Sequence, residues 1–334
     1  MKIAIIGAGA IGGLVAGYLK LKEQDISLVG HADSVKAIKE NGLQISGVRG
    51  SFNAKLDVTE NLDFQPDLVI LATKSQDIEI ALRDNFPFLQ NSLILTTQNG
   101  LRADELVARF VSEENIISSI VMFGSTLLRP GVIVHNFEGS WILGRIFGKI
   151  DTKAVEISEF LNKIFPTVIS DEIKGMKYLK VFVNANNCIP AILGLAMQET
   201  FSDINISAIS IAIWKEGLDI IDKVGIKLVS LPDFPVERLT KLTALPTLQA
   251  AKIFSGIMTN LSKEPLYGSI LQSIKRGKTS EIDYINGEFV NLAKSNNLKA
   301  SLNEKLVRMV HQVEATHNFF NKEELINNTK GLLM

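Results

Sequence analysis

The stretch Ile3-Ala-Ile-Ile-Gly-Ala-Gly-Ala-Ile-Gly12 carries the clearest structural signal of the chain. A short apolar run enters three glycines spaced GxGxxG, and an apolar helical pattern that includes Leu14 and Leu19 follows them. This order predicts a strand, a tight turn and a helix, which is the context in which the spacing indicates a dinucleotide site. A glycine-rich turn that binds no ligand is the alternative.

Each position of this turn has an expected task. Gly7 would permit the sharp bend, Gly9 would let a pyrophosphate come close to the backbone, and Gly12 would let the helix pack on the strand. The N–H groups of the first helical turn, which includes Ala10 and Ile11, would face the phosphates.

Strand and helix signals alternate from this turn to about residue 169. Further apolar strands are predicted at 26–29, 43–45, 67–72 and 92–97, and short helices at 35–41 and 76–86. Such alternation predicts an α/β fold with a doubly wound, mostly parallel sheet of the Rossmann type. Between 116 and 143, strands around the turn pair Pro130-Gly131 predict an antiparallel extension at one sheet edge.

From residue 170 onward, helical periodicity replaces the strand signals. The predicted helical patterns are 173–197, 203–225, 236–260, 266–276, 281–296 and 302–316. We therefore expect a dinucleotide-binding domain over 1–169 and an all-helical substrate and catalytic domain over 170–334. Ligands of doubly wound sheets bind at the carboxyl ends of the strands, and we expect this edge to face a cleft between the domains.

The composition excludes several classes of function. Of the 334 residues, 46% are hydrophobic and 21% are charged, and the net charge is −1 without any basic stripe, so nucleic acid is not an expected partner. Since no run reaches about 18 apolar residues, no membrane span is expected. A single cysteine, Cys188, favours a reducing, cytoplasmic location. His135, His311 and His317 lack metal-ligand spacing, so no metal is predicted; we expect His311 and His317 to be solvated.

Polar residues follow two of the predicted strands. Lys74 comes after the 67–72 strand, and Asn99 comes after the 92–97 strand. The loops that carry them should converge on the dinucleotide, because parallel strands end at the same edge of the sheet. A solvated lysine and a simple Asn-Gly turn are equally compatible with this pattern.

Lys180, Asn184 and Cys188 are spaced i, i+4 and i+8, which predicts one shared helical face. A lysine and an amide on a partly apolar face suit the binding and protonation of a carbonyl oxygen. Burial and a nearby positive nicotinamide ring would lower the pKa of the lysine and help it act as an acid. A snorkelling lysine beside a solvated asparagine is the alternative.

Ser269 and Glu281 belong to two further polar segments. Thr279 or Ser280 is a good helix N-cap, and Glu281 and Asp283 suit the first turn of the helix that would follow. Capping alone accounts for these residues.

Together these segments resemble the ketopantoate reductase (2-dehydropantoate 2-reductase) family over nearly the whole chain. The most specific segment is Glu281-Ile-Asp-Tyr-Ile-Asn-Gly287. The other matching segments are Gly7–Gly12, Ala37–Leu43, Asp67–Lys74, Gln98–Gly100, Lys180–Asn184 and Ser269–Gln272. The resemblance implies NADPH-dependent reduction of ketopantoate to pantoate, a step of pantothenate biosynthesis.

The resemblance also implies roles in catalysis and substrate binding. Lys180 would be the general acid that protonates the ketone oxygen, and Glu281 would position it, contact the nascent hydroxyl and border the cofactor. Asn184, Ser269 and the residue at position 188 would bind substrate. The family usually carries an asparagine where Cys188 stands, so a paralogous reductase of another small 2-oxo acid is the close alternative.

Cofactor choice depends on the end of the second strand. Lys74 and Asn99 would lie beside the nicotinamide, while His31 stands where the family usually has an arginine for the 2′-phosphate of NADP. No carboxylate for a ribose 2′-hydroxyl occupies this place, although Asp33 is close, so NADP is favoured and NAD stays open. A surface role for His31 is the alternative. A non-catalytic NAD(P) sensor is a more distant one, and a homodimer is the assembly considered.

Overall fold

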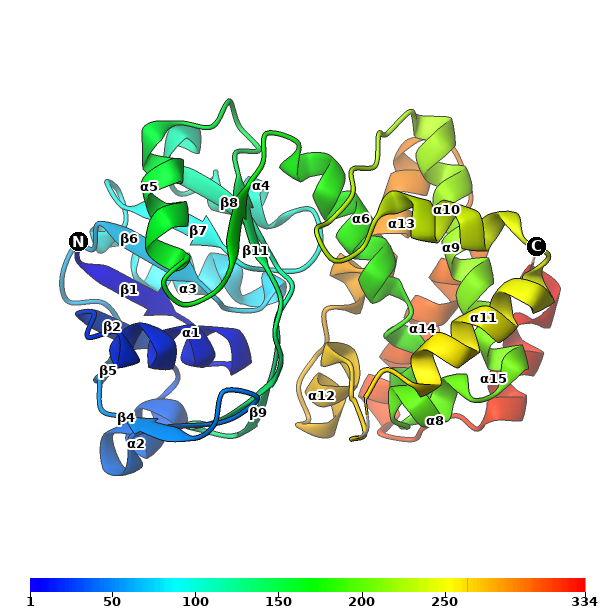
Figure 1. The fold of residues 1–334 in the computed structure, drawn as a ribbon, viewed down its shortest axis with the longest axis horizontal. Helices are drawn as coiled ribbons and strands as arrows, with labels where there is room; N and C mark the ends of the chain where they lie inside the picture. The colour runs from blue at the N-terminus through cyan, green and yellow to red at the C-terminus, as the bar shows by residue number, and fades with distance from the viewer. Residues whose placement is uncertain (263, 334) are drawn as a thin grey trace. The chain divides into compact units, whose positions relative to one another are not determined.

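The computed structural model describes residues 1–262 and 264–333. It divides into two compact units, Met1–Lys174 and Gly175–Met334 (Figure 1). The division falls a few residues beyond the predicted boundary at 169 because the residues that follow the last strand still pack on the sheet. The Ser170 N–H donates to the Leu143 carbonyl at 2.9 Å, for example.

The first unit is built on an eight-stranded sheet of order β12-β11-β8-β7-β6-β1-β2-β5. All neighbouring strands are parallel except β11 and β8, which are antiparallel. The strands are β1 (Ile3–Ile6), β2 (Ile26–Val29), β5 (Asp57–Thr59), β6 (Leu68–Leu71), β7 (Leu93–Thr96), β8 (Ile116–Val121), β11 (Trp141–Gly144) and β12 (Thr167–Ile169). The chain order reverses between β1 and β6, and doubly wound folds bind their ligands at such a point. The predicted doubly wound fold is therefore confirmed.

A second, four-stranded sheet of order β4-β3-β10-β9 was not foreseen. Its strands are β3 (Leu43–Gly47), β4 (Phe52–Ala54), β9 (Gly124–Arg129) and β10 (Val132–Phe137). The hairpin around Pro130-Gly131 joins β3 here instead of extending the main sheet. The other two strands of the 116–143 region, β8 and β11, do form an antiparallel pair near one edge of the main sheet, next to the edge strand β12. Pairing partners lie far apart in the chain, so local patterns do not reveal them.

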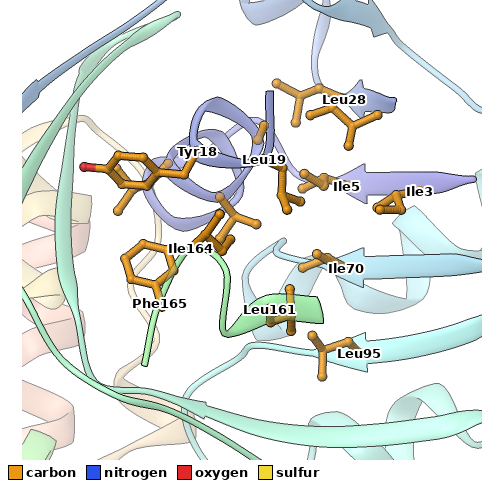
Figure 2. Close-up of a cluster of buried hydrophobic side chains, with 14 of the residues drawn as sticks. Ile3, Ile5, Tyr18, Leu19, Leu28, Ile70, Leu95, Leu161, Ile164 and Phe165 are labelled. Atoms are coloured by element: carbon orange, nitrogen blue, oxygen red, sulfur yellow. The ribbon is translucent and has the colours of Figure 1, made fainter. Parts of the chain in front are cut away.

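Helices cover both faces of the main sheet, which explains why its central strands are apolar throughout. They are α1 (Ala10–Leu21), α2 (Ala32–Asn41), α3 (Ile78–Asp84), α4 (Ala103–Val107) and α5 (Thr152–Leu161), with 3₁₀ turns η1 (Ser75–Asp77), η2 (Phe86–Phe88) and η3 (Glu113–Asn115). Figure 2 shows one core, in which Ile3, Ile5 and Ile70 face Leu19 and Leu161. Alternate strand residues line the opposite core.

The second unit is helical, as predicted. Its elements are α6 (Ile173–Ala185, which begins in the first unit), α7 (Cys188–Leu193), α8 (Met197–Phe201), α9 (Ile204–Val224), α10 (Val236–Ala244), α11 (Thr247–Thr259), α12 (Ser269–Lys275), η4 (Ile282–Tyr284), α13 (Asn286–Ser295), α14 (Ser301–Thr316), α15 (Lys322–Thr329) and η5 (Lys330–Leu332). The long, largely buried α9 is capped by Asp203, which accepts hydrogen bonds from the N–H groups of Asn205 and Ile206. Across the described residues, no helix combines the length and the apolar character that a membrane crossing requires.

Three of the predicted helical patterns are interrupted. The 236–260 pattern breaks at Leu245-Pro246, where the residue before proline is extended. The 173–197 pattern stops at Ala185, restarts at Cys188 and stops again at Gly194, which has φ of +72°. The 281–296 pattern begins as the 3₁₀ turn η4 and becomes α13 only at Asn286. Periodicity identified the faces of these helices but not their breaks.

Candidate active site

The glycine turn has the backbone that a phosphate cradle needs. Gly7 has φ of +116°, and a Cβ on it would lie 2.6 Å from the carbonyl carbon of Ala72. A Cβ on Gly12 would collide with the Gly7 carbonyl oxygen, whereas a Cβ on Gly9 would meet nothing within 4 Å. Side chains are thus excluded at two positions by the fold, while open space lies beside the third.

These residues fit a dinucleotide. The first helical hydrogen bond of α1 runs from the Gly13 N–H to the Gly9 carbonyl at 2.9 Å, so the earlier N–H groups at Ala10 and Ile11 lie ahead of the helical ladder. Close by, the buried hydroxyl of Thr73 has no hydrogen-bond partner in the described structure, and such an orphaned group suits a polar ligand.

The residue directly after β2 has no room for a side chain. Gly30 follows this strand, and a Cβ on it would lie 2.6 Å from the Cβ of Ala8. His31 comes next as the exposed, extended N-cap of α2. The nearby Asp33 accepts a hydrogen bond at 2.7 Å from the N–H of Ser34, a contact within its own helical turn. The histidine is thus the exposed basic side chain at this strand end.

The loops after β6 and β7 are tied together, as the prediction that they converge requires. The Gln98 side chain donates to the carbonyls of Leu71 and Thr73 at 2.9 and 3.0 Å. The Ser75 hydroxyl donates to the Asn99 carbonyl at 3.3 Å. Lys74 and Asn99 are both partly buried in these loops, and their place beside a nicotinamide stays a prediction. Gln98 therefore links the two loops through its side chain, a role that the sequence pattern did not indicate.

In the second unit, Lys180 and Asn184 share one face of α6, as their spacing predicts. Both side chains are partly buried. Burial lowers the pKa of Lys180 to about 8, against the opposing influence of the Asp233 carboxylate. A lysine with this pKa is protonated at neutral pH and can give up its proton readily, as a general acid must.

Cys188 lies beyond the end of α6. Because α6 ends at Ala185, Cys188 starts α7 with no exposed surface, and its thiol lies beside Asn286. Burial raises the pKa of this thiol to about 12. The predicted helix is therefore not continuous from Lys180 to Cys188, since Asn186 and Asn187 form a turn between α6 and α7.

Asn187, inside this break, lies against a different predicted element. Its side chain is the nearest neighbour of Gly268, where a Cβ would lie 3.1 Å from the Asn187 Cγ. The next residue, Ser269, is exposed at the start of α12. The break in α6 thus brings an amide beside the serine predicted to bind substrate. The Gln198 side chain donates to the Ser262 and Glu264 carbonyls at 3.1 and 2.8 Å and so holds the loop before α12.

Glu281 is only 9% exposed and stands directly before η4. No Thr279 or Ser280 side chain caps a long helix here; the Ser280 hydroxyl accepts from the Ile282 N–H at 3.3 Å within a short turn. His311, predicted to be solvated, contacts Asp283 and Glu314 at 3.0 and 2.9 Å. The His311 side chain is 41% exposed, so the expectation holds in part, but its two carboxylate partners were not expected because α14 packs beside η4, a tertiary contact that the sequence pattern does not display.

Sequence reasoning also missed the buried carboxylate of Glu216 in α9. Its oxygens accept hydrogen bonds at 2.8 Å from the N–H groups of Leu302 and Asn303 and from the Asn303 side chain. Asn303 in turn accepts from Asn286 at 3.0 Å. An acidic residue among the apolar positions of a helix is the signal that could have revealed this network.

Dinucleotide-dependent oxidoreductases are the class of protein that this combination of fold and side chains defines. Residues 3–147 match the family described as ketopantoate reductase PanE/ApbA, and residues 172–314 match the family described as its C-terminal part. The chain therefore belongs to the ketopantoate reductase family.

Individual relatives agree with this assignment. A 2-dehydropantoate 2-reductase of Pyrococcus horikoshii is 32% identical over 321 residues, which span 94% of this chain and 98% of that protein. A D-mandelate dehydrogenase solved with NADH and anilino(oxo)acetate is 27% identical, with a TM-score of 0.80 and coverage of 95% and 99%. A PanE/ApbA family ketopantoate reductase from Ralstonia eutropha has the same fold, with 22% identity, a TM-score of 0.78 and coverage of 94% and 99%.

Proposed function

We propose that this protein reduces a small 2-oxo acid to the 2-hydroxy acid with NADPH, and that 2-dehydropantoate is its substrate. The observation that carries the proposal is Lys180, whose pKa of about 8 suits a proton donor to a ketone oxygen. The relatives named 2-dehydropantoate 2-reductase, which align over nearly the full chain, support the choice of substrate.

Each residue of the site has a place in this proposal. The glycine turn and the N-terminus of α1 would hold the pyrophosphate, and a reduced nicotinamide supplies the hydride when it is bound. Lys180 would donate its Nζ proton to the ketone oxygen as negative charge develops there. Glu281 would hold the lysine and the nascent hydroxyl, while Asn184 and Ser269 would orient the substrate. Fixing Lys180 and Asn184 on α6 contributes to the rate because the reacting atoms need less reorganisation.

A panel of 2-oxo acids tests the proposal. Consumption of NADPH and of NADH is followed by absorbance with 2-dehydropantoate, pyruvate, 2-oxoisovalerate and phenylglyoxylate as substrates. We expect the highest kcat/KM with 2-dehydropantoate and NADPH. Turnover of 2-dehydropantoate no faster than that of pyruvate would contradict the substrate assignment. Dinucleotide binding without turnover of any of these acids would favour a non-catalytic sensor.

A second candidate, a reductase specific for another 2-oxo acid, is favoured by Cys188. The buried thiol at this position removes an amide that would hold a hydroxylated substrate. The D-mandelate dehydrogenase similar to this chain was solved with NADH and an aromatic 2-oxo compound. This candidate predicts a preference for phenylglyoxylate or a branched 2-oxo acid in the same panel.

A further inference from the structure

A histidine bridge joins α14 to the segment that carries Glu281. We define it as His311 and Glu314 of α14 together with Asp283 of η4. The His311 Nε2 lies 3.0 Å from an Asp283 oxygen, and its Nδ1 lies 2.9 Å from Glu314 Oε2. The other Glu314 oxygen, Oε1, accepts a hydrogen bond at 2.7 Å from the N–H of Ser280. Glu281 is thus flanked by two residues that the bridge holds.

The geometry of the bridge requires a protonated imidazole. A neutral imidazole has one N–H and one lone pair, so it can donate to only one of two carboxylates. Here both ring nitrogens face carboxylate oxygens at hydrogen-bond distance, and only the imidazolium can donate to both. Loss of the proton would turn a lone pair toward one carboxylate and break that half of the bridge.

The two sides of the bridge differ in how firmly they are anchored. On one side, α14 is fixed in the core through Leu306, Val310 and Val313, all of them buried. On the other side, the chain between α12 and α13 is irregular, with Gly277 at φ of +65° and Ile285 at φ of −120° and ψ of −89°. Regular helical hydrogen bonds therefore supply little of the order that Glu281 needs.

We propose that His311 is a positioning residue, which as an imidazolium holds the 280–283 segment so that Glu281 keeps its catalytic orientation. The inference rests on the proposed function, since it assigns His311 a task in that reaction. His311 acts through Asp283, Glu314 and the Ser280 backbone and contacts no reacting atom.

The charges around His311 give the direction of its pH dependence. Partial burial lowers the pKa of His311, but hydrogen bonds and charge interactions with Glu314 and Asp283 outweigh it and raise this pKa above its ordinary value of 6.5. These two carboxylates, from α14 and η4, are the charged groups that act on the ring. A group with a raised pKa contributes its full stabilisation at low pH and loses it as the pH rises through that pKa. Positioning of Glu281 should therefore weaken at alkaline pH.

A titration by NMR of the full chain tests the bridge without reference to activity. We expect the imidazole signals of His311 to titrate above pH 6.5 and the backbone amide signals of Ser280 and Glu281 to shift with the same midpoint. Asp283→Asn, which changes an exposed residue of the bridge, should lower the pH midpoint of the His311 titration. The proposal would be overturned by a His311 titration midpoint at or below pH 6.5. It would also be overturned if the amide signals of Ser280 and Glu281 did not shift with that midpoint.

Kinetics with saturating substrates then test the effect on Glu281. His311→Gln, which is uncharged and carries its donors on a single nitrogen, should lower kcat about tenfold at pH 6.5 with an unchanged KM for the dinucleotide. The ratio of wild-type to variant kcat should shrink as the pH rises through the His311 midpoint found by NMR, because the native bridge is then lost as well. The control His317→Asn changes the other histidine of this helix end, which has φ of +55°, and should match wild type. A constant ratio at every pH would indicate a merely structural role and would refute the proposal.

The two sets of results separate this inference from the proposed function. If wild type turns over no 2-oxo acid, the proposed function fails, and the titration alone decides whether the bridge orders the Glu281 segment. If His311→Gln unfolds, Asp283→Ala removes one acceptor of the same bridge from the surface and replaces it in the kinetic test.

Discussion

Protonation of Lys180 should set the alkaline limit of activity. With a pKa of about 8, its ammonium form is about 90% populated at pH 7 and about 10% at pH 9. A lysine with the ordinary pKa of 10.5 would still be about 97% protonated at pH 9. Because the proton donor is the ammonium, kcat should be nearly constant below pH 7 and should fall about tenfold per pH unit above pH 8.

Substitutions at and near Lys180 test whether its deprotonation causes the fall of kcat at alkaline pH. Lys180→Ala should lower kcat at pH 7 by about two powers of ten and remove the alkaline fall, since the donor is gone. Asp233→Asn should move the fall to lower pH, because the native carboxylate raises the pKa of the lysine. Lys174→Ala is the matched control, an exposed lysine of the same helix.

The assay is steady-state oxidation of NADPH at saturating 2-oxo acid from pH 6 to pH 10. Lys180→Ala with a kcat within threefold of wild type would refute the assignment of the general acid. A shift of the alkaline limb to higher pH in Asp233→Asn would refute the electrostatic argument.

Three further substitutions test other parts of the structure. Gly7→Ala should weaken NADPH binding more than about tenfold and lower the Tm. The reason is that Gly7 has φ of +116° and the new Cβ would lie 2.6 Å from the Ala72 carbonyl carbon. An unchanged Kd for NADPH in a fluorescence titration would contradict this. His31→Arg should raise the preference for NADPH over NADH about tenfold, because the guanidinium is always charged; equal kcat/KM ratios in variant and wild type would exclude a role for His31. Glu216→Gln should lower the free energy of unfolding, measured in urea, by about 2–4 kcal/mol. Three donors at 2.8 Å, among them the N–H and side chain of Asn303, would lose their charged acceptor. A decrease below about 1 kcal/mol would mean that water takes the place of the carboxylate.

The strands and helices that depend on local patterns were predictable. The buried run at 67–72 and the glycine turn before α1 sit where they were expected, because period and turn chemistry act over a few residues. The interruption at Leu245-Pro246 was also within reach, since proline restricts the residue before it. The break after Ala185 has a comparable marker in Pro190, which has no N–H to donate to the carbonyl of Asn186 and so disfavours one continuous helix through Cys188.

The order of strands was only partly predictable for a related reason. The hairpin at 124–137 looked like an edge of the main sheet because its local signals are those of any hairpin. Its actual partner, β3, lies 88 residues earlier in the chain, and the pairing follows from how β3 and β10 pack over α1.

The sequence by itself determined the class of fold, the dinucleotide turn and the family, because these depend on short motifs and on periodicities that any chain displays in one dimension. Only the tertiary structure decided how individual groups behave. The pKa of Lys180 depends on burial and on Asp233, and the state of His311 depends on Asp283 as well as Glu314. Dielectric environment and charge pairing arise when distant segments meet, so the chemistry of a side chain is settled by neighbours that its place in the chain does not reveal.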